Sequence, residues 1–386
     1  MNKKLAIIIS HPIQYYSPLF QRLAKQCDLK VFYTLGNSDQ HFDIGFQRDV
    51  KWDIPLLSGY NYSFIDNRAK NPSPNHFTGI VNPNLINEIQ SFAPHAILFY
   101  GWAYYSHLKA MMYFKKKIPI WFRGDSNLSD KQSMLKKTAR KMLLNWVYSK
   151  VNKAFYVGTA NKDYFKHFGL KEKELFFCPH AVDNDRFGKD RNSEALTLRT
   201  KLEIETHDVL ILFAGKLEEK KDPALLLNAF LELNISTMHL LFVGNGHLED
   251  FLKKTAQNDQ NFKRIHFLDF QNQSFMPVVY QACDLFCLPS KGPNETWGLS
   301  VNEAMAAKKA VLVSNKVGCW QDLVKENYNG FIFKSEKIDD LKEKLLLLND
   351  KEKLKKLGQN SSEIIASWSF EKQSQKFIQQ LYASIR

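Results

Sequence analysis

Two glutamates, Glu295 and Glu303, are spaced so that both could bind one substrate, and Gly298 lies between them. The apolar run 284–288 before them predicts a buried strand, which two prolines and a glycine in 289–293 end. Ser300 is predicted to open a helix, and Glu303 follows it at a capping-box spacing. One carboxylate is therefore expected in a loop, and the other on the first turn of the helix that follows.

The backbone amides of residues 297–301 would point out of that helix N-terminus, between the two carboxylates. Exposed amides at a helix start favour anions, so the segment could hold a sugar phosphate while the glutamates bind hydroxyls. A plainer interpretation stays open at this point: Glu303 only caps the helix and Glu295 is a solvated loop residue.

The length of 386 residues allows two domains with a core each, and 44% hydrophobic content is ordinary for a globular protein. The five cysteines are scattered, which argues against a disulfide framework and favours a reducing compartment. Cys283 and Cys287 are interpreted as core residues rather than metal ligands. The apolar run near Met1 is too short for a signal peptide or a membrane span.

The net charge of +13 is unevenly distributed along the chain. Residues 1–188 hold 26 Lys and Arg against 14 Asp and Glu, whereas the remainder holds 53 − 26 = 27 against 40 − 14 = 26. A basic N-terminal half indicates an anionic partner, such as a membrane surface, an acidic glycan or a nucleic acid.

The N-terminal half begins with a strand ending at Ser10, a helix from Ser17 to Cys27 and a strand over 29–33. This is one unit of a parallel sheet, and the loop after its first strand lies at the ligand edge. That loop supplies three candidate acceptor-binding residues: His11, Gln14 and Tyr15. For His11, a plain loop position held by Pro12 is an equal alternative.

Further candidates follow two later strands, 96–100 and 118–122. Trp102 follows the first, and Arg123 and Asp125 follow the second. Asp125 could accept a proton or hold an acceptor hydroxyl; alternatively it is a turn aspartate that pairs with Arg123. Residues 36–84, which show little periodicity, are interpreted as an irregular excursion that could form an acceptor-side lid.

The segment from Lys131 to Lys153 combines seven basic residues with apolar residues at helical spacing. A basic amphipathic helix of this kind can lie on an anionic bilayer. For the apolar stripe, packing against the sheet is the favoured interpretation; the lysines suit a membrane-facing side.

The C-terminal half alternates strands and helices in a Rossmann-like pattern from about Leu196 onward. Its predicted strands are 209–214, 239–243, 264–268, 285–288, 310–314 and 330–333. A last helix is predicted to start near Trp368.

The segment with Glu295 and Glu303 resembles the E-x(7)-E signature of family 4 retaining glycosyltransferases. Four more segments resemble motifs of that family, in the same order: 179–187 between the domains, Gly215-Lys216 with Lys221, the Gly244-Asn-Gly246 turn, and 280–284. The resemblance covers nearly all of the C-terminal half and little of the N-terminal half.

The resemblance implies an α/β GT-B fold, with two Rossmann-like domains facing each other across a cleft. The acceptor domain would span 1–188, the sugar-nucleotide domain 196–366, and a final helix over 367–386 would cross back to the first domain. Glu303 would hold the ribose, and Glu295 the transferred sugar; Lys216 and Lys221 would stabilise the leaving diphosphate. The expected donor-binding residues are Gly215, Lys216, Lys221, Gly244, Trp297, Gly298, Leu299, Ser300, Glu303 and Gly318.

Three positions depart from the family pattern. Lys216 occupies a position where an arginine is usual. It would therefore contact the phosphate as a single point charge, whereas an arginine can donate two parallel hydrogen bonds. Cys319 replaces a glycine, and Asp125 falls nearest to the usual histidine. Glu295, Asp125, Lys221 and Lys216 are the catalytic candidates. Asp183 and Asp185 resemble a metal-binding pair, but no catalytic metal and no cofactor other than the sugar nucleotide, by default UDP-linked, is expected.

The sequence thus predicts a glycosyltransferase that moves a sugar with retention of configuration to a lipid-linked or cell-envelope glycan. It would act in the cytoplasm, at the inner face of the cytoplasmic membrane. One alternative is a transferase acting on a small soluble acceptor. Another is a nucleic-acid-binding protein, which the charge allows but no nucleic-acid motif supports.

Overall fold

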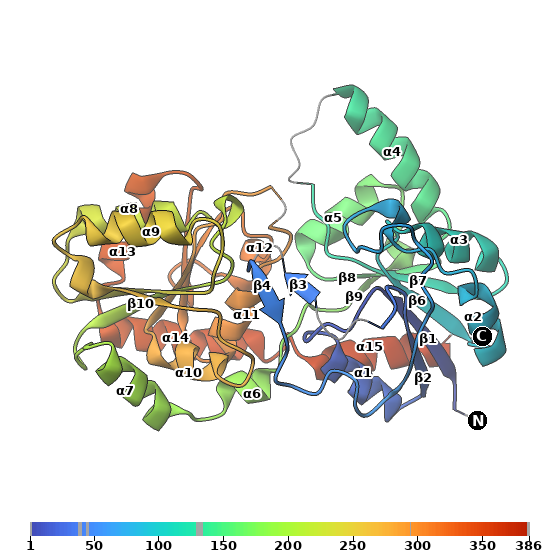
Figure 1. The fold of residues 1–386 in the computed structure, drawn as a ribbon, viewed down its shortest axis with the longest axis horizontal. Helices are drawn as coiled ribbons and strands as arrows, with labels where there is room; N and C mark the ends of the chain where they lie inside the picture. Colours follow the sequence, from blue (N-terminus) through green and yellow to red (C-terminus); the bar gives the residue numbers. More distant parts are fainter. Residues whose placement is uncertain (1, 38–40, 44–45, 129–133, 294, 384–386) are drawn as a thin grey trace. The chain divides into compact units, whose positions relative to one another are not determined.

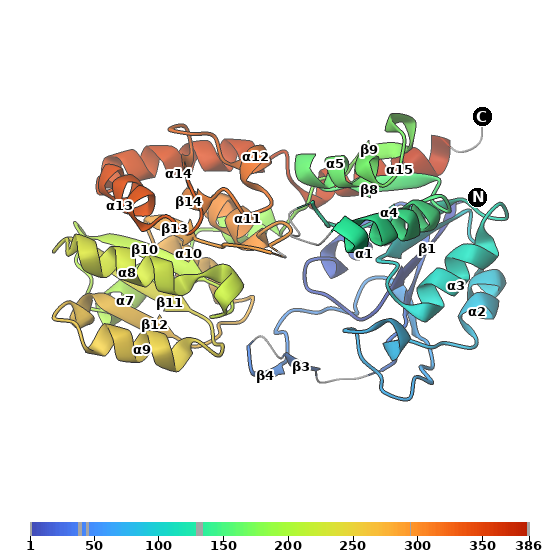
Figure 2. The ribbon, with the colours of Figure 1, turned by 90° about the horizontal axis from the view of Figure 1, so that it is seen from above.

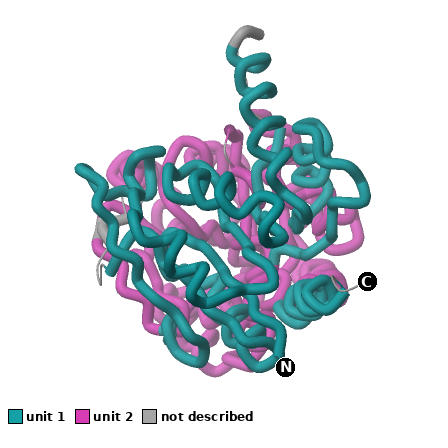
Figure 3. The backbone as a smooth tube through the Cα atoms, turned by 90° about the vertical axis from the view of Figure 1, so that its right-hand side faces the viewer, with its two compact units in different colours: residues 1–39, 54–180, 370–386 teal, residues 40–53, 181–369 magenta. Residues whose placement is uncertain are grey.

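The computed structural model describes residues 2–37, 41–43, 46–128, 134–293 and 295–383, without the side chains of 41–43, 48, 134 and 135. The chain forms two compact units (Figure 3). Unit 1 comprises residues 1–39, 54–180 and 370–386, and unit 2 comprises residues 40–53 and 181–369. The C-terminal segment therefore belongs to the same unit as the N-terminus.

Unit 1 is built on a seven-stranded parallel sheet with the strand order β5-β2-β1-β6-β7-β8-β9. The strands are β1 (Lys4–Ile9), β2 (Asp28–Tyr33), β5 (Asn61–Phe64), β6 (Ala96–Tyr100), β7 (Ile120–Arg123), β8 (Lys153–Tyr156) and β9 (Leu175–Phe177). The central strands β1, β6 and β7 are continuous apolar runs because helices cover both of their faces.

Helices cover the two faces of this sheet. They are α1 (Ser17–Ala24), α2 (Leu85–Phe92), α3 (Tyr105–Phe114), α4 (Met134–Tyr148), α5 (Thr159–His167) and α15 (Phe370–Ala383), with 3-10 turns at Phe77–Gly79 and Glu172–Glu174. One core cluster joins alternate strand residues to α2, α3, α4 and α5. On the opposite face α1 contacts α15, and Phe377 of α15 packs on Trp121 and Phe155.

Unit 2 contains a six-stranded parallel sheet with the order β12-β11-β10-β13-β14-β15. The strands are β10 (Val209–Ala214), β11 (Met238–Val243), β12 (Ile265–Leu268), β13 (Leu285–Leu288), β14 (Ala310–Ser314) and β15 (Gly330–Phe333). The order reverses beside β10, so the carboxyl ends of β10 and β13 flank the switch point at which α/β sheets bind ligands. All six predicted strands are confirmed, with shifts of one residue at two starts.

The helices of unit 2 are α6 (Asn184–Gly188), α7 (Asn192–Lys201), α8 (Pro223–Leu233), α9 (Glu249–Gln257), α10 (Met276–Ala282), α11 (Leu299–Ala306), α12 (Trp320–Leu323), α13 (Ile338–Leu347) and α14 (Lys351–Ile365), with 3-10 turns at Glu219–Lys221 and Phe262–Arg264. Within this unit, α8, α9 and α13 lie on one face of the sheet, and α10 and α14 on the other (Figures 1 and 2). Among the described residues, no helix has the length and apolarity needed to cross a bilayer.

The interpretation of 36–84 as an irregular lid is wrong in two respects. Asn61–Phe64 forms β5, which lies at the end of the unit 1 sheet beside β2, and its exposed and half-buried residues do not form an apolar run. Residues 40–53 are part of unit 2, where β3 (His41–Asp43) and β4 (Arg48–Val50) pair antiparallel. Residues 38–40 and 44–45 lie outside the described part of the excursion.

Candidate active site

Lys221 and Glu295 meet at the carboxyl edge of the unit 2 sheet. Lys221 ends the 3-10 turn after β10, and Glu295 lies in the loop after β13. The Nζ of Lys221 is 2.5 Å from Oε2 of Glu295, which also accepts a hydrogen bond of 3.0 Å from Ser290. Glu295 is only 6% exposed, so the solvated-loop alternative is wrong.

Glu303 lies inside α11 rather than at its cap. The helix begins at Leu299, and its N-cap is Gly298, whose φ of 96° favours a glycine. The predicted capping box from Ser300 is therefore wrong. Glu303 instead is 4% exposed and accepts a hydrogen bond of 2.8 Å from the hydroxyl of Tyr280. Its carboxylate is thus fixed by α10, and the amides at the start of α11 stay available to an anion.

The loop that carries Glu295 is held against residues 317–319 through backbone contacts. Gly318 donates to the carbonyl of Glu295 at 3.1 Å, and Cys319 to that of Trp297 at 2.9 Å. A Cβ at Gly318 would lie 1.8 Å from the carbonyl oxygen of Thr296, so this position requires glycine. Gly318 supports the loop by close packing.

The side chain of Trp297 is a structural element of the loop. It is 3% exposed, its indole donates to Asn302 at 2.9 Å, and its ring packs on Trp368 at 5.2 Å. The predicted helix after Cys319 is only one turn, Trp320–Leu323. Of the two helix starts predicted to bind an anion, only that of α11 begins a helix longer than one turn.

The glycines after β10 and β11 allow two backbone segments to approach closely. Gly244 has φ 130°, and a Cβ there would lie 2.2 Å from the carbonyl oxygen of Gly215. Gly215 has φ 154° with open space around the Cβ position. Lys216 follows at this edge, and its ammonium lies 5.1 Å from the ring centroid of Phe46.

The two aspartates considered as metal ligands behave as helix residues. Asp183 is the N-cap of α6 and accepts from the amide of Arg186 at 3.1 Å, and Asp185 lies in the first turn. In the described part of the chain, no group of three His, Cys, Asp or Glu side chains is placed to hold a metal ion.

Unit 1 has a pocket of about 280 Å³ at the carboxyl ends of β1, β6 and β7. Trp102, Arg123 and Asp125, predicted separately from sequence, all line it. His11, Gln14 and Tyr15 are not among its lining residues. His11 instead lies with Nδ1 2.9 Å from Oγ of Ser10.

Arg123 is largely a structural residue of this pocket. It is 1% exposed and donates to the carbonyls of Cys178 and Pro179 at 2.9 and 3.1 Å. Burial opposes its charge, but Cys178, Tyr100, Tyr16 and Asp125 together raise its pKa. Burial, and then the charge of Asp125, raise the pKa of Tyr16, so this pocket hydroxyl stays protonated.

Sequence reasoning missed Tyr100, which also lines the pocket. Within the described structure, its buried hydroxyl and Nε of Arg123 have no hydrogen-bond partner. Buried polar atoms are normally satisfied, so both atoms are suited to a ligand that accepts hydrogen bonds. The position of Tyr100 at the end of a buried strand was the available signal.

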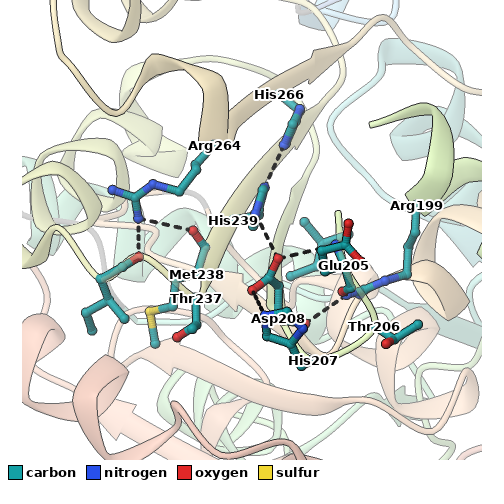
Figure 4. Close-up of polar contacts among 12 residues, drawn as sticks. Arg199, Glu205, Thr206, His207, Asp208, Thr237, Met238, His239, Arg264 and His266 are labelled. Atoms are coloured by element: carbon teal, nitrogen blue, oxygen red, sulfur yellow. Dashed lines mark hydrogen bonds and ion pairs between the residues drawn. The ribbon is translucent and has the colours of Figure 1, made fainter. Parts of the chain in front are cut away.

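A second buried polar cluster lies at the opposite, amino-terminal edge of the unit 2 sheet (Figure 4). Oδ2 of Asp208 is 3.3 Å from Nε2 of His239, whose Nδ1 is 3.1 Å from Nε2 of His266. Burial and the adjacent His239 lower the pKa of His266 to about 4. Asp208 lies just before the start of β10, whereas Lys216 follows the end of the same strand. The cluster therefore lies at the opposite end of the sheet from Lys216, and we interpret it as structural.

Comparisons with known proteins match the C-terminal part of the chain to a family and the whole chain to a fold. Residues 195–364 match the family Glycosyl transferases group 1. An Escherichia coli UDP-Gal:alpha-D-GlcNAc-diphosphoundecaprenol alpha-1,3-galactosyltransferase is 29% identical over 202 residues, which cover 50% of each chain. A D-inositol 3-phosphate glycosyltransferase of Rhodococcus jostii (strain RHA1) is 27% identical over 184 residues, which cover 45% of this chain and 39% of that protein.

The chain spans about half or less of the length of the curated relatives it matches. The crystal structure of Anabaena HepE in complex with UDP superposes over 99% of this chain and 100% of that chain, with a TM-score of 0.74 and 16% identity. The chain thus has the GT-B fold of two parallel Rossmann-like sheets, and its residues 195–364 match the group 1 glycosyl transferase family.

Proposed function

We propose that this protein is a glycosyltransferase that transfers a sugar, with retention, from a UDP-linked donor to a lipid-linked or cell-envelope glycan. The part of the proposal that concerns the sugar-nucleotide donor rests on one observation: Lys221 pairs with the buried Glu295 in front of α11. A fixed cation and helix amides are what a departing nucleoside diphosphate requires, because negative charge accumulates on it in the transition state.

In unit 2, Lys216 and Lys221 would contact the diphosphate together with the amides of Gly298, Leu299 and Ser300. Glu303, oriented by Tyr280, would accept hydrogen bonds from the ribose hydroxyls. Glu295 would hold hydroxyls of the transferred sugar, as the family resemblance implies.

The pocket of unit 1 would bind the sugar end of the acceptor. Aromatic walls from Tyr16 and Trp102 suit a sugar ring, and Tyr100 and Arg123 offer donors to its oxygens. Asp125 at the same pocket would hold the attacking hydroxyl.

The surface of α4 supports an acceptor presented at a membrane. Leu144, Val147 and Tyr148 are buried against unit 1, whereas Met142, Leu143 and Trp146 are 67, 46 and 42% exposed. The sequence interpretation of one sheet-packed apolar stripe is therefore only half right, because the helix has two apolar sides. Figures 1 and 3 show the first turns of α4 projecting away from the rest of unit 1.

The sequence in and around α4 is strongly basic. Residues 131–162 contain eight Lys and Arg and no Asp or Glu, although Lys131 itself lies outside the described part. Burial, and then the charge of Lys115, lower the pKa of Lys150, so Lys115 lies close to the residues that follow α4. Exposed apolar residues on a helix rich in basic residues are typical of helices that lie on anionic bilayers.

The donor half is tested with a panel of nucleoside diphosphates and sugar nucleotides in thermal unfolding. A binder at 100 times its Kd should stabilise the protein by about 2.7 kcal/mol. UDP should stabilise it, and Glu303→Ala should reduce that effect. A panel in which no nucleotide stabilises the protein would contradict the donor assignment.

The acceptor half is tested by offering two acceptors beside one labelled UDP-sugar: a polyprenyl-diphosphate-linked sugar in anionic vesicles, and inositol phosphate in solution. Label that moves into the lipid fraction supports the proposal. Label that moves to inositol phosphate supports the alternative, a small-molecule transferase like the Rhodococcus relative. Proton couplings at the new anomeric centre show whether configuration is retained.

A further inference from the structure

Residues 40–53 come from the first half of the chain but are part of unit 2. The chain leaves unit 1 after β2, forms the β3–β4 hairpin and returns to unit 1 before β5. An insertion of this kind puts side chains encoded near the N-terminus beside the donor residues.

The end of the segment is tied to the loop between β12 and α10. The carboxylate of Asp53 accepts from the amide of Ser274 at 3.2 Å, and Asn272 donates to the carbonyl of Lys51 at 2.6 Å. Trp52 packs on Phe270, with ring centroids 5.8 Å apart. Several independent contacts thus hold these residues at the carboxyl edge of the unit 2 sheet.

A continuous set of contacts leads from this anchor to the donor lysine. Phe46 packs edge-on against Phe270 at 4.9 Å, and the amide of Phe270 donates to Oδ1 of Asn245 at 2.8 Å. The carbonyl of Asn245, within the glycine turn, accepts from the amide of Leu217 at 3.0 Å. Leu217 directly follows Lys216, whose ammonium lies 5.1 Å from the centroid of the Phe46 ring.

We propose that Phe46 is a positioning residue of the donor site, whose ring face holds the ammonium of Lys216 toward the diphosphate. This inference rests on the proposed function, because it assigns Lys216 to the donor phosphates. The face of an aromatic ring attracts a cation without forming an ion pair with it. A carboxylate in the place of Phe46 would compete with the phosphate for the same ammonium.

The proposal predicts a phosphate-dependent effect of the ring. Phe46→Leu keeps an apolar side chain but removes the π face, so the Kd for UDP should rise about two- to fivefold. Uridine, which has no phosphate, should bind the variant and the wild type equally. Phe46→Tyr keeps the ring face and should bind UDP like the wild type.

Two comparisons separate positioning from general packing. Phe262→Leu makes the same change at a phenylalanine of unit 2 that is 49% exposed, and it should leave UDP affinity unchanged. In a Lys216→Ala background, Phe46→Leu should have no further effect on UDP affinity, because the cation is gone. All affinities are measured by calorimetry on the full chain.

Equal losses for uridine and UDP, or the same loss with and without Lys216, would overturn the role of Phe46 and leave it a packing residue. Unchanged UDP affinity in Phe46→Leu would overturn it as well. If the wild type binds no UDP, the proposed donor function itself fails.

Discussion

The ammonium of Lys221 lies 2.5 Å from the carboxylate of Glu295, and both side chains are largely buried, with 15 and 7% of their area exposed. The two side chains therefore form an ion pair in a site from which water is mostly excluded. Removing either partner would leave a buried charge without compensation, which is costly in itself. The same pair would be placed between the leaving diphosphate and the transferred sugar.

Lys221→Ala should lower kcat/KM roughly tenfold or more, because one desolvated cation on a leaving phosphate contributes upwards of about 1.4 kcal/mol. Initial rates of donor hydrolysis measure the effect. The neighbouring Lys220 pairs with Glu218 at 3.3 Å and is 38% exposed, so Lys220→Ala is a matched control that should retain activity. An unchanged kcat/KM in Lys221→Ala would remove this lysine from the donor site.

Activity should survive EDTA. The reason is that Lys216, Lys221 and the amides at the start of α11 can stabilise the diphosphate in the way a metal ion does in other enzymes. Rates are compared before and after treatment with the chelator, and again after Mg²⁺ or Mn²⁺ is returned. Loss of activity that either metal restores would contradict this view and bring Asp183 and Asp185 back as ligands.

Replacing Lys136, Lys137, Arg140 and Lys141 of α4 by Glu should release the protein from anionic liposomes. Each basic residue near such a surface contributes about 1 kcal/mol, and the attraction fades within a Debye length. Donor hydrolysis should stay nearly unchanged because Lys221 and Glu295 belong to unit 2. Cosedimentation with vesicles measures the release.

The matched control for this variant reverses four exposed lysines of unit 2: Lys201, Lys263, Lys355 and Lys356. It makes the same change in net charge and should leave vesicle binding intact. If the wild-type protein binds neutral and anionic vesicles alike, the basic charge of the N-terminal half does not serve membrane binding. The alternative of a soluble acceptor then becomes the better one.

The stability of unit 2 should fall as the pH drops from about 6.5 to about 4. In the folded state the pKa of His266 is lowered to about 4, by burial first and then by His239, so the unfolded state binds the proton more readily. Stability is complete above the unfolded pKa and declines by up to about 3 kcal/mol through this window.

Denaturant titrations at a series of pH values measure this decline. His266→Gln removes the titrating ring but keeps a polar partner for His239, so the decline between pH 6.5 and 4 should become shallower. The burial that lowers the pKa of His239 leaves part of the slope in place. A slope that is the same in the variant would show that His266 gains its proton in the folded state near its ordinary pKa.

Local sequence patterns predicted the strands of unit 2 and the approximate positions of several candidate site residues. The apolar runs of unit 2 predicted its six strands because a strand covered on both faces must be apolar along its length. The break after 285–288 and the spacing of Glu295 and Glu303 placed Glu295 in a loop and Glu303 on the helix that follows, because turn residues and helix starts are encoded within a few positions. Trp102, Arg123 and Asp125 could be placed at one edge because parallel strands end together.

Only the tertiary structure decided how distant segments meet. It pairs Lys221 with Glu295, gives Glu303 a partner in Tyr280, and makes residues 40–53 part of unit 2, where Phe46 reaches Lys216. It also divides the apolar residues of α4 between a buried and an exposed side. The sequence shows whether a side chain is apolar or charged. The partner that buries or neutralises that side chain depends on contacts between residues far apart in the sequence.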